Sequence, residues 1–174
     1  MDISHTSDQL SSSTKRFPDC CVALSTTVIA GLASLLPRNP AFTLSVGSGS
    51  GLLEALIVNR NPDVSVEGVE VDSTINRYIE EERMNVVGGG WGLCSRASQA
   101  SVWMFVYPRD PKLITKYIDA HADQVEQIVW LGPRVDWLDY EPCFVQSRFS
   151  TLTFPNIGLA PYEVVVVARK SAQS

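Results

Sequence analysis

Three glycines at alternate positions, Gly47, Gly49 and Gly51, follow directly after an apolar run that begins at Phe42. Because glycine has no Cβ, a chain with this spacing can turn sharply and let a ligand lie against its main chain. Apolar residues recur at helical spacing from Leu52 onward, so the glycines are predicted to lie in a strand-to-helix turn. Open α/β sheets bind their ligands at this edge, beyond the carboxyl ends of the strands.

An acidic residue, Glu70, follows near the end of a second alternating segment, residues 64–71. A carboxylate at the end of a second strand can accept hydrogen bonds from both hydroxyls of a ribose. The glycine pattern is G-x-G-x-G, whereas the dinucleotide pattern G-x-G-x-x-G would need glycine where Leu52 stands. The spacing therefore argues against a dinucleotide.

Residues 42–72 resemble the first motif and the following acidic-strand motif of class I S-adenosylmethionine-dependent methyltransferases. Residues 102–108 and 127–133 are similar to the fourth and fifth strands of that family, and residues 148–154 with 162–168 to its closing antiparallel hairpin. The resemblance implies S-adenosylmethionine as the cofactor. The residues that it assigns to cofactor binding are Ser45, Gly47, Ser48, Gly49, Gly51, Glu70 and Val71.

Two positions depart from the family pattern. Ser45 stands where the family usually has an acidic residue, and residues 86–101, after the third strand, contain no carboxylate. Three interpretations stay open: a small-molecule methyltransferase, for example in secondary metabolism; a methyltransferase-like enzyme that catalyses a cofactor-independent cyclisation or rearrangement of a small apolar substrate; and a non-catalytic accessory subunit. The glycine pattern and Glu70 favour the first interpretation.

Three side chains near the ends of the predicted fourth and fifth strands are candidate catalytic residues. Tyr107 can donate a hydrogen bond to a carbonyl or phenolate, and Arg109 can hold a carboxylate with its planar fork. Arg134 would face the same cleft from the loop after the fifth strand. A structural alternative stays open, since Asp110 is placed to cap a helix and to pair with Arg109.

Aromatic side chains are predicted to line an apolar substrate pocket: Trp91, Tyr107, Trp137 and Tyr140. Ordinary core packing is the alternative for each of them. The sequence contains no G-x-S-x-G, H-E-x-x-H or P-loop motif, and no Asp/His cluster for a divalent cation. We therefore expect a small-molecule substrate and no metal.

A mostly parallel sheet is required to bring these residues to one edge. Strand and helix alternate along the chain, which predicts a single-domain α/β, Rossmann-like methyltransferase fold with right-handed crossovers, helices on both faces and a C-terminal antiparallel hairpin. A crossover helix is expected over about residues 72–83, and a third strand near residues 86–87. A further helix should begin at Pro111, with Asp110 as its cap.

The N-terminal part is predicted to divide into a polar, flexible tail over residues 1–16 and a methyltransferase-like domain over residues 17–174. Residues 17–40 are expected to form a helix that covers the site, with Asp19 as its cap. The apolar run within residues 20–36 is short and interrupted by serine and threonine, so no membrane association is expected.

Composition and charge limit the kinds of partner that this protein is expected to have. A chain of 174 residues, 45% of them hydrophobic, suits one domain. Its net charge is −5 and it has no long basic run, which disfavours nucleic acid as a partner. The four cysteines lack the spacing of a zinc site, and reduced thiols predict a cytoplasmic protein. Because little chain remains for a substrate-binding insertion, a second subunit is one way to hold the substrate, and a homodimer is a further expectation.

Overall fold

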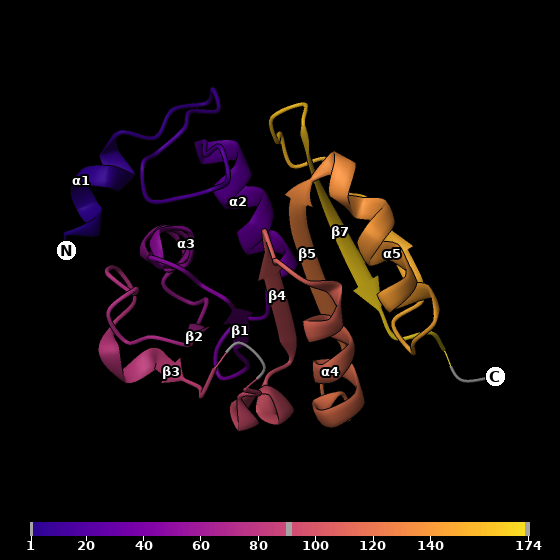
Figure 1. Ribbon diagram of the computed structural model, residues 1–174. Coiled ribbons are helices and arrows are strands. Elements are labelled where there is room, and N and C mark those ends of the chain that lie inside the picture. Colours follow the sequence, from indigo (N-terminus) through magenta and orange to yellow (C-terminus); the bar gives the residue numbers. More distant parts are fainter. Residues whose placement is uncertain (1, 90–91, 173–174) are drawn as a thin grey trace.

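The computed structural model describes residues 2–89 and 92–172, which form one mixed sheet with helices on both faces (Figure 1). The strands are β1 Thr43–Val46, β2 Val66–Glu70, β3 Met84–Val86, β4 Val102–Val106, β5 Gln127–Pro133, β6 Thr151–Thr153 and β7 Glu163–Arg169. They lie in the order β3-β2-β1-β4-β5-β7-β6. β1 to β5 pair in parallel, while β7 runs antiparallel to both β5 and β6. The predicted mostly parallel sheet with a C-terminal antiparallel hairpin is thereby confirmed.

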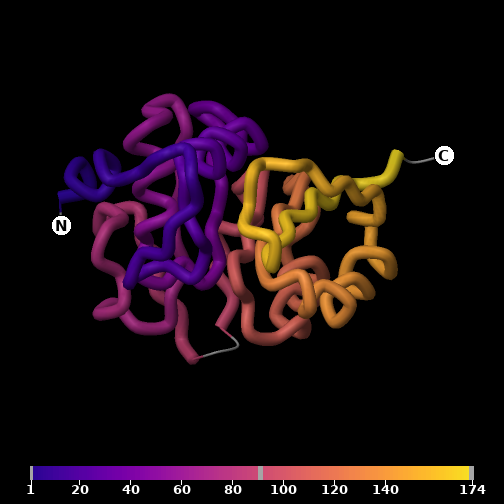
Figure 2. The backbone as a smooth tube through the Cα atoms, turned by 90° about the horizontal axis from the view of Figure 1, so that it is seen from above, coloured from indigo at the N-terminus to yellow at the C-terminus, as the bar shows by residue number. Residues whose placement is uncertain are grey.

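The helices cover both faces of this sheet, as predicted. They are α1 Ile3–Asp8, α2 Thr26–Leu35, α3 Leu52–Arg60, α4 Pro111–His121 and α5 Trp137–Val145, with 3₁₀ turns at Glu81–Arg83, Ser95–Gln99 and Arg134–Asp136. α2 and α3 pack on one face, and α4 and α5 on the other. In Figure 2 the N-terminal half, indigo to magenta, lies beside the C-terminal half, orange to yellow.

Alternation along β4 divides the core between these two faces. Trp103 and Phe105 point toward α4 and α5, whereas Met104, between them, points toward α2 and α3. All three are fully buried, and Trp103 Nε1 donates to the carbonyl of Ala97 (2.9 Å), so the indole is also satisfied as a donor. This packing fixes the carboxyl end of β4, from which Tyr107 emerges.

The helix predicted at Pro111 is confirmed, together with its cap. Asp110 has extended backbone dihedrals, and its Oδ1 accepts a hydrogen bond from Lys112 N (2.9 Å). Pro111 occupies the first turn, where its missing N–H is harmless. Ile114 and Tyr117 then face the core at helical spacing.

Part of the expected flexible tail is helical. α1 packs against α3 (Figure 1), and Arg60 Nη1 in α3 donates to Ser7 Oγ (3.3 Å). Ile3 packs against the α2–α3 side of the core, which explains why this polar segment is held down. The tail prediction for residues 1–16 is therefore corrected over α1.

The helix predicted over residues 17–40 is shorter than expected and begins later. Lys15 and Leu24 exchange two backbone hydrogen bonds of 2.8 Å, which hold the intervening residues in a loop. α2 starts only after Ser25, whose Oγ accepts from Val28 N (3.0 Å). Asp19 is therefore not a helix cap, and non-helical chain stands beside the glycine turn.

The crossover helix predicted over residues 72–83 is wrong. Asp72 Oδ1 accepts from both the backbone N and the hydroxyl of Thr74 at 2.8 Å, and the Asn76 side chain bonds both backbone groups of Ile79. Such local side-chain bonds compete with the helical ladder. Turns replace the helix up to the 3₁₀ turn at Glu81–Arg83, and β3 begins at Met84, before the position expected from sequence.

Candidate functional site

The glycine turn joins β1 to α3 as predicted, and all three of its glycines have positive φ. These angles are +76° at Gly47, +60° at Gly49 and +80° at Gly51. A Cβ placed on Gly47 or Gly49 would meet no atom within 4 Å, whereas one on Gly51 would lie 2.7 Å from Asn76 Oδ1 and Ile79 Cγ1. Gly51 is thus required for packing, and the other two leave open space above the main chain.

Glu70 lies across from this turn and bonds to it. Its Oε1 accepts a hydrogen bond from Gly49 N (2.7 Å), and its Oε2 accepts from Val71 N (3.2 Å). Parallel pairing of β1 with β2 produces this approach, because it sets Val46 opposite Val69 and ends both strands at one edge. Two ionised carboxylate oxygens offer about four acceptor sites, so capacity remains for a ligand's hydroxyls.

A cavity of about 820 Å³ adjoins the glycine turn. It is lined by Gly49 and Ser50, by residues 16–21, and by Thr74, Ile75 and Arg77. Asp19, predicted to be a helix cap, instead connects the loop to the other two segments. Its carbonyl accepts a hydrogen bond from Ser50 Oγ (2.6 Å), and its Oδ2 accepts one from Tyr78 Oη (3.2 Å). The segment expected to cover the site as a helix thus borders it as a loop.

Ser45 does not face this cavity, which corrects its expected place in cofactor binding. Its side chain is 1% exposed, and its Oγ donates to Glu54 Oε1 (3.4 Å) in the first turn of α3. Glu54 is itself only 3% exposed, and its Oε2 has no partner among the described residues. Burial raises the pKa of the Glu54 carboxyl to about 7. Nothing in the sequence distinguishes this glutamate from an ordinary first-turn acid.

Tyr107 has the backbone strain that marks functional sites. Its φ is +50°, which is uncommon for a residue with a bulky side chain. Its hydroxyl donates to Glu163 Oε2 (2.7 Å), and Ala23 N donates to the other oxygen of this carboxyl (3.3 Å). Burial and the bond to Glu163 raise the pKa of Tyr107, and burial raises the pKa of Glu163. The phenol is thus held protonated as a donor.

Arg134 joins this group, and Arg109 does not. Arg134 Nη2 donates to the Glu163 backbone carbonyl (3.3 Å), on the strand pair where Pro133 faces Glu163. Arg109 is exposed and makes no hydrogen bond or ion pair within the described residues, so the expected pair with Asp110 is absent. Sequence analysis missed Glu163, although a lone acid before a run of valines was a signal that could have drawn attention to it.

Two of the aromatic residues predicted to line a pocket lie in the core instead. Trp137 and Tyr140 occupy the inner face of α5, with ring centroids 5.3 Å and 5.2 Å from Trp130. Tyr140 Oη also donates to the carbonyl of Pro108 (2.7 Å), which ties α5 to the turn after β4. Their helical spacing places them on one buried face. Trp91 lies outside the described residues.

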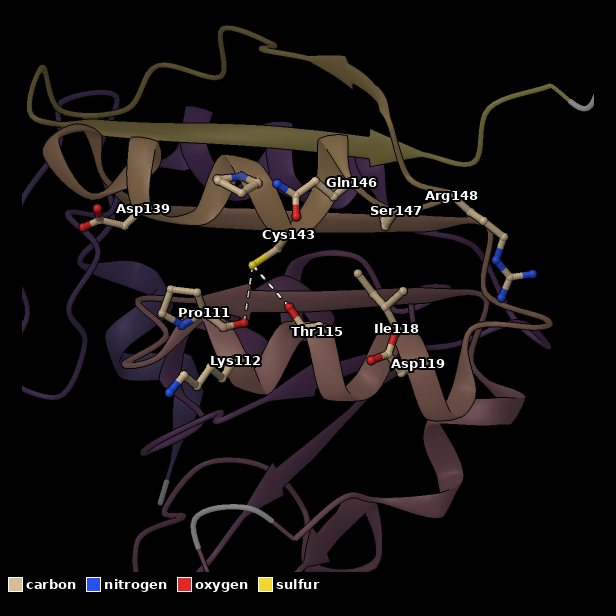
Figure 3. Close-up of a pocket in the computed structure, with 11 residues that line it drawn as sticks. Pro111, Lys112, Thr115, Ile118, Asp119, Asp139, Cys143, Gln146, Ser147 and Arg148 are labelled. Carbon is tan, nitrogen blue, oxygen red and sulfur yellow. Dashed lines mark hydrogen bonds between the residues drawn. The ribbon is translucent and has the colours of Figure 1, made fainter.

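A separate cavity of about 700 Å³ lies between α4 and α5 (Figure 3). Cys143 points into it from α5, accepting from Thr115 Oγ1 (3.6 Å) and donating to the carbonyl of Pro111 (3.4 Å). The residues that line it belong to α4, α5 and the following loop, not to the glycine turn. It is therefore separate from the candidate site.

No helix within residues 2–89 and 92–172 is long and apolar enough to cross a membrane. No group of three or more His, Cys, Asp or Glu side chains in the same ranges is arranged to hold a metal ion.

The Tyr107–Glu163 bond predicts a stability difference between neighbouring variants. Tyr107→Phe is expected to lower the free energy of unfolding by about 2 kcal/mol, because it removes a donor to a buried carboxyl. Arg109→Ala, two residues away and unbonded, is the control and should be neutral. Urea unfolding measures both. Equal stability of the two variants would show that the Tyr107 hydroxyl contributes nothing to the fold.

This protein is similar to known proteins in its three-dimensional structure, while its sequence matches none of them. No family model and no curated protein matches the sequence. The methyltransferase domain of the bacterial protein CtHen1-C is 14% identical, with a TM-score of 0.63 over 84% of this chain and 96% of that one. Precorrin-6y C5,15-methyltransferase from Geobacter metallireducens GS-15 is 12% identical, with a TM-score of 0.62 over 91% and 94%.

A third similar structure contains S-adenosylmethionine. Human N-acetylserotonin methyltransferase in complex with S-adenosylmethionine is 13% identical, with a TM-score of 0.56 over 84% of this chain and 51% of that one. All three are described as methyltransferases, and the human one holds S-adenosylmethionine. At such low identity the likeness establishes the fold, and the chain has the class I methyltransferase fold.

Proposed function

We propose that this protein is an S-adenosylmethionine-dependent methyltransferase that acts on a small molecule. The observation that carries the proposal is the bond from Gly49 N to Glu70, which holds a carboxylate beside two glycines with open space above them. A backbone that a ligand can approach this closely, next to an acceptor at the end of β2, suits an adenosine group.

The residues present fit the cofactor at most of the positions that it would contact. Gly47 and Gly49 would lie against it, since a Cβ at either would project into open space. Glu70 would accept from the ribose hydroxyls with the lone pairs that Gly49 and Val71 leave free. Ser45 contributes no side-chain contact, because it is turned toward Glu54.

Tyr107 and Glu163 supply the candidate machinery for the methyl acceptor. S-adenosylmethionine, when bound, supplies a methyl group on a sulfonium, and in-line transfer depends chiefly on the position of the acceptor. Glu163 fixes the direction of the Tyr107 hydroxyl, whose lone pairs can then accept a hydrogen bond from an acceptor O–H or N–H. Arg134 holds the Glu163 backbone in place.

Charge and cavity size favour a small substrate. The cavity of about 820 Å³ lies within the range of small-molecule sites. The net charge of −5 disfavours a phosphate backbone as the substrate. All four cysteines are free thiols, which suits a reducing compartment such as the cytoplasm.

A cofactor-independent rearrangement is the second candidate function, and one observation favours it. The position usually held by an acid is occupied by Ser45, whose hydroxyl is buried and bonded within the core. A protein without that contact would bind the cofactor less well. In this alternative, the Tyr107 hydroxyl would exchange Glu163 for a substrate carbonyl as its acceptor, without any methyl transfer.

Cofactor binding tests the proposal directly. Glu70→Ala is expected to weaken S-adenosylhomocysteine binding about tenfold in calorimetry, because the ribose hydroxyls lose a charged acceptor. Glu70→Gln, which keeps one acceptor oxygen, should fall between that variant and the wild type. Glu81→Ala, an exposed acid in the 3₁₀ turn before β3, is the control. No heat with the wild-type protein at millimolar ligand would reject methyl transfer and promote the rearrangement.

A further inference from the structure

An arginine without an acidic partner lines the cavity beside the glycine turn. Arg16, in the loop before α2, belongs to the lining of this cavity of about 820 Å³. Its Nη1 donates a hydrogen bond to Tyr162 Oη (3.3 Å), just before β7, and it forms no ion pair with a carboxylate among the described residues. The loop and the start of β7 lie at the same end of the sheet (Figure 1). Because the Arg16 side chain is exposed, a ligand can reach its other N–H groups.

The Arg16 guanidinium lies beside the residues proposed to position the methyl acceptor. Tyr162 directly precedes Glu163, whose Oε2 accepts from Tyr107 Oη (2.7 Å). The hydrogen bond to Tyr162 is the main cause that raises the pKa of Arg16, and Tyr107 and Glu163 contribute to the same increase. The Glu163 carboxyl is nevertheless bonded to Tyr107 and to Ala23 N, not to Arg16. The guanidinium thus keeps its donors for a ligand next to Tyr107.

The charges that line this cavity favour an anion. They belong to two bases, Arg16 and Arg77, and to one acid, Asp19. Asp19 Oδ1 lies 3.7 Å from Arg77 Nη1, and Asp19 Oδ2 accepts from Tyr78 Oη, so the acid is already engaged. One positive charge therefore remains uncompensated among the lining residues, although the whole protein carries a net charge of −5.

We propose that the methyl acceptor is a small carboxylic acid, whose carboxylate is held by the Arg16 guanidinium while its apolar part contacts Pro18 and Ile75. Both of these apolar residues are exposed and line the same cavity. A planar guanidinium matches a carboxylate with two parallel hydrogen bonds. The Tyr162 hydroxyl accepts from Arg16 and keeps its own proton to donate. This inference rests on the proposed function, since it names the chemical class of the acceptor.

The probe is 3-phenylpropionate, with 3-phenylpropan-1-ol and 3-phenylpropan-1-amine as its neutral and cationic matches. Calorimetry of the full chain at neutral pH should show that the acid binds, that the alcohol binds about fivefold more weakly and that the amine binds most weakly, because only the acid forms an ion pair at this exposed position.

Variants at Arg16 assign the effect to its guanidinium. Arg16→Gln should weaken binding of the acid about fivefold and leave binding of the alcohol unchanged. Arg16→Lys, which keeps the charge and loses the planar fork, should fall between Arg16→Gln and the wild type. Lys15→Gln is the matched control: it removes the same charge from the preceding residue, whose ammonium lies over the Phe17 ring and which does not line the cavity. Because both side chains are exposed, all three variants should keep the wild-type melting temperature.

Binding of S-adenosylhomocysteine separates this inference from the proposed function. This ligand carries a carboxylate of its own, and Arg16→Gln should bind it with wild-type affinity. A loss of that affinity would assign the guanidinium to the cofactor and overturn the inference. The inference is also overturned if the acid binds no more tightly than the alcohol, or if Arg16→Gln and Lys15→Gln weaken binding of the acid equally. If the wild type binds the acid in the expected order but does not bind S-adenosylhomocysteine, the proposed function fails and the carboxylate site stands.

Discussion

Gly49→Val is expected to weaken S-adenosylhomocysteine binding about 100-fold, which corresponds to roughly 2.7 kcal/mol. The valine side chain would occupy the open space above the turn, where the ligand is proposed to meet the main chain. Its effect on folding should be smaller, since its Cβ would meet no atom within 4 Å and the main cost is the strain of φ +60°. Such strain is of the order of 1–2 kcal/mol.

Gly51→Val provides the matched control two residues away. Its φ of +80° imposes similar strain, but a Cβ there would lie 2.7 Å from Asn76 and Ile79. We expect Gly51→Val to lose considerably more melting temperature than Gly49→Val. Calorimetry and thermal unfolding separate the two effects. A Gly49→Val protein that binds with wild-type affinity would exclude the turn from the cofactor site.

Short sequence patterns were enough to predict β5, the start of α4 and the glycine turn. The bounds of β5 were predicted correctly, because its apolar run over residues 127–133 ends at a proline. The start of α4 followed from an Asp-Pro pair, and its cap is formed as expected. The glycine turn was found because three alternate glycines have no simple role inside a regular element.

The predictions of two helices failed for different reasons. In one segment, side chains bond nearby main-chain groups in place of the helical hydrogen bonds. In the other, the chain is held by residues that are far away in sequence. Asp72 and Asn76 bond nearby main-chain groups and replace a helix whose apolar spacing looked sound. Residues 17–24 are held by Lys15 and by the bond from Ser50 to Asp19, which is 31 residues away in sequence. The spacing of apolar residues shows neither these local side-chain bonds nor these distant contacts.

The candidate site was predicted only in part for the same reason. Glu70 ends β2 and the glycines follow β1, so the pairing of these two strands brings them together. The partner of Tyr107 is 56 residues away on an antiparallel strand, and only tertiary pairing reveals Glu163. Trp137 and Tyr140 were assigned to a pocket because the sequence does not show which face of α5 meets the sheet.

Glu54→Gln is expected to become more stable relative to the wild-type protein as the pH rises, by about 3 kcal/mol between pH 4 and pH 8. Burial is the main cause that raises the pKa of Glu54 to about 7 from its ordinary value of 4.5, and the nearby carboxylate of Glu70 contributes to the same increase. Between these two values the folded protein binds the proton more tightly than the unfolded chain does. The free energy of unfolding of the wild type therefore falls as pH rises through this window.

Comparison of the two proteins isolates the contribution of Glu54. Glu163, whose pKa is also raised by burial, is present in both and cancels in the difference. Glutamine has no proton to lose, so its buried amide carries no such penalty at any pH in this range. Urea unfolding at several pH values gives the difference directly, and Glu80→Gln, which changes an exposed acid, is the control. If the difference between Glu54→Gln and wild type did not change with pH, Glu54 would be hydrated or paired in solution, and its carboxyl would carry no penalty of burial.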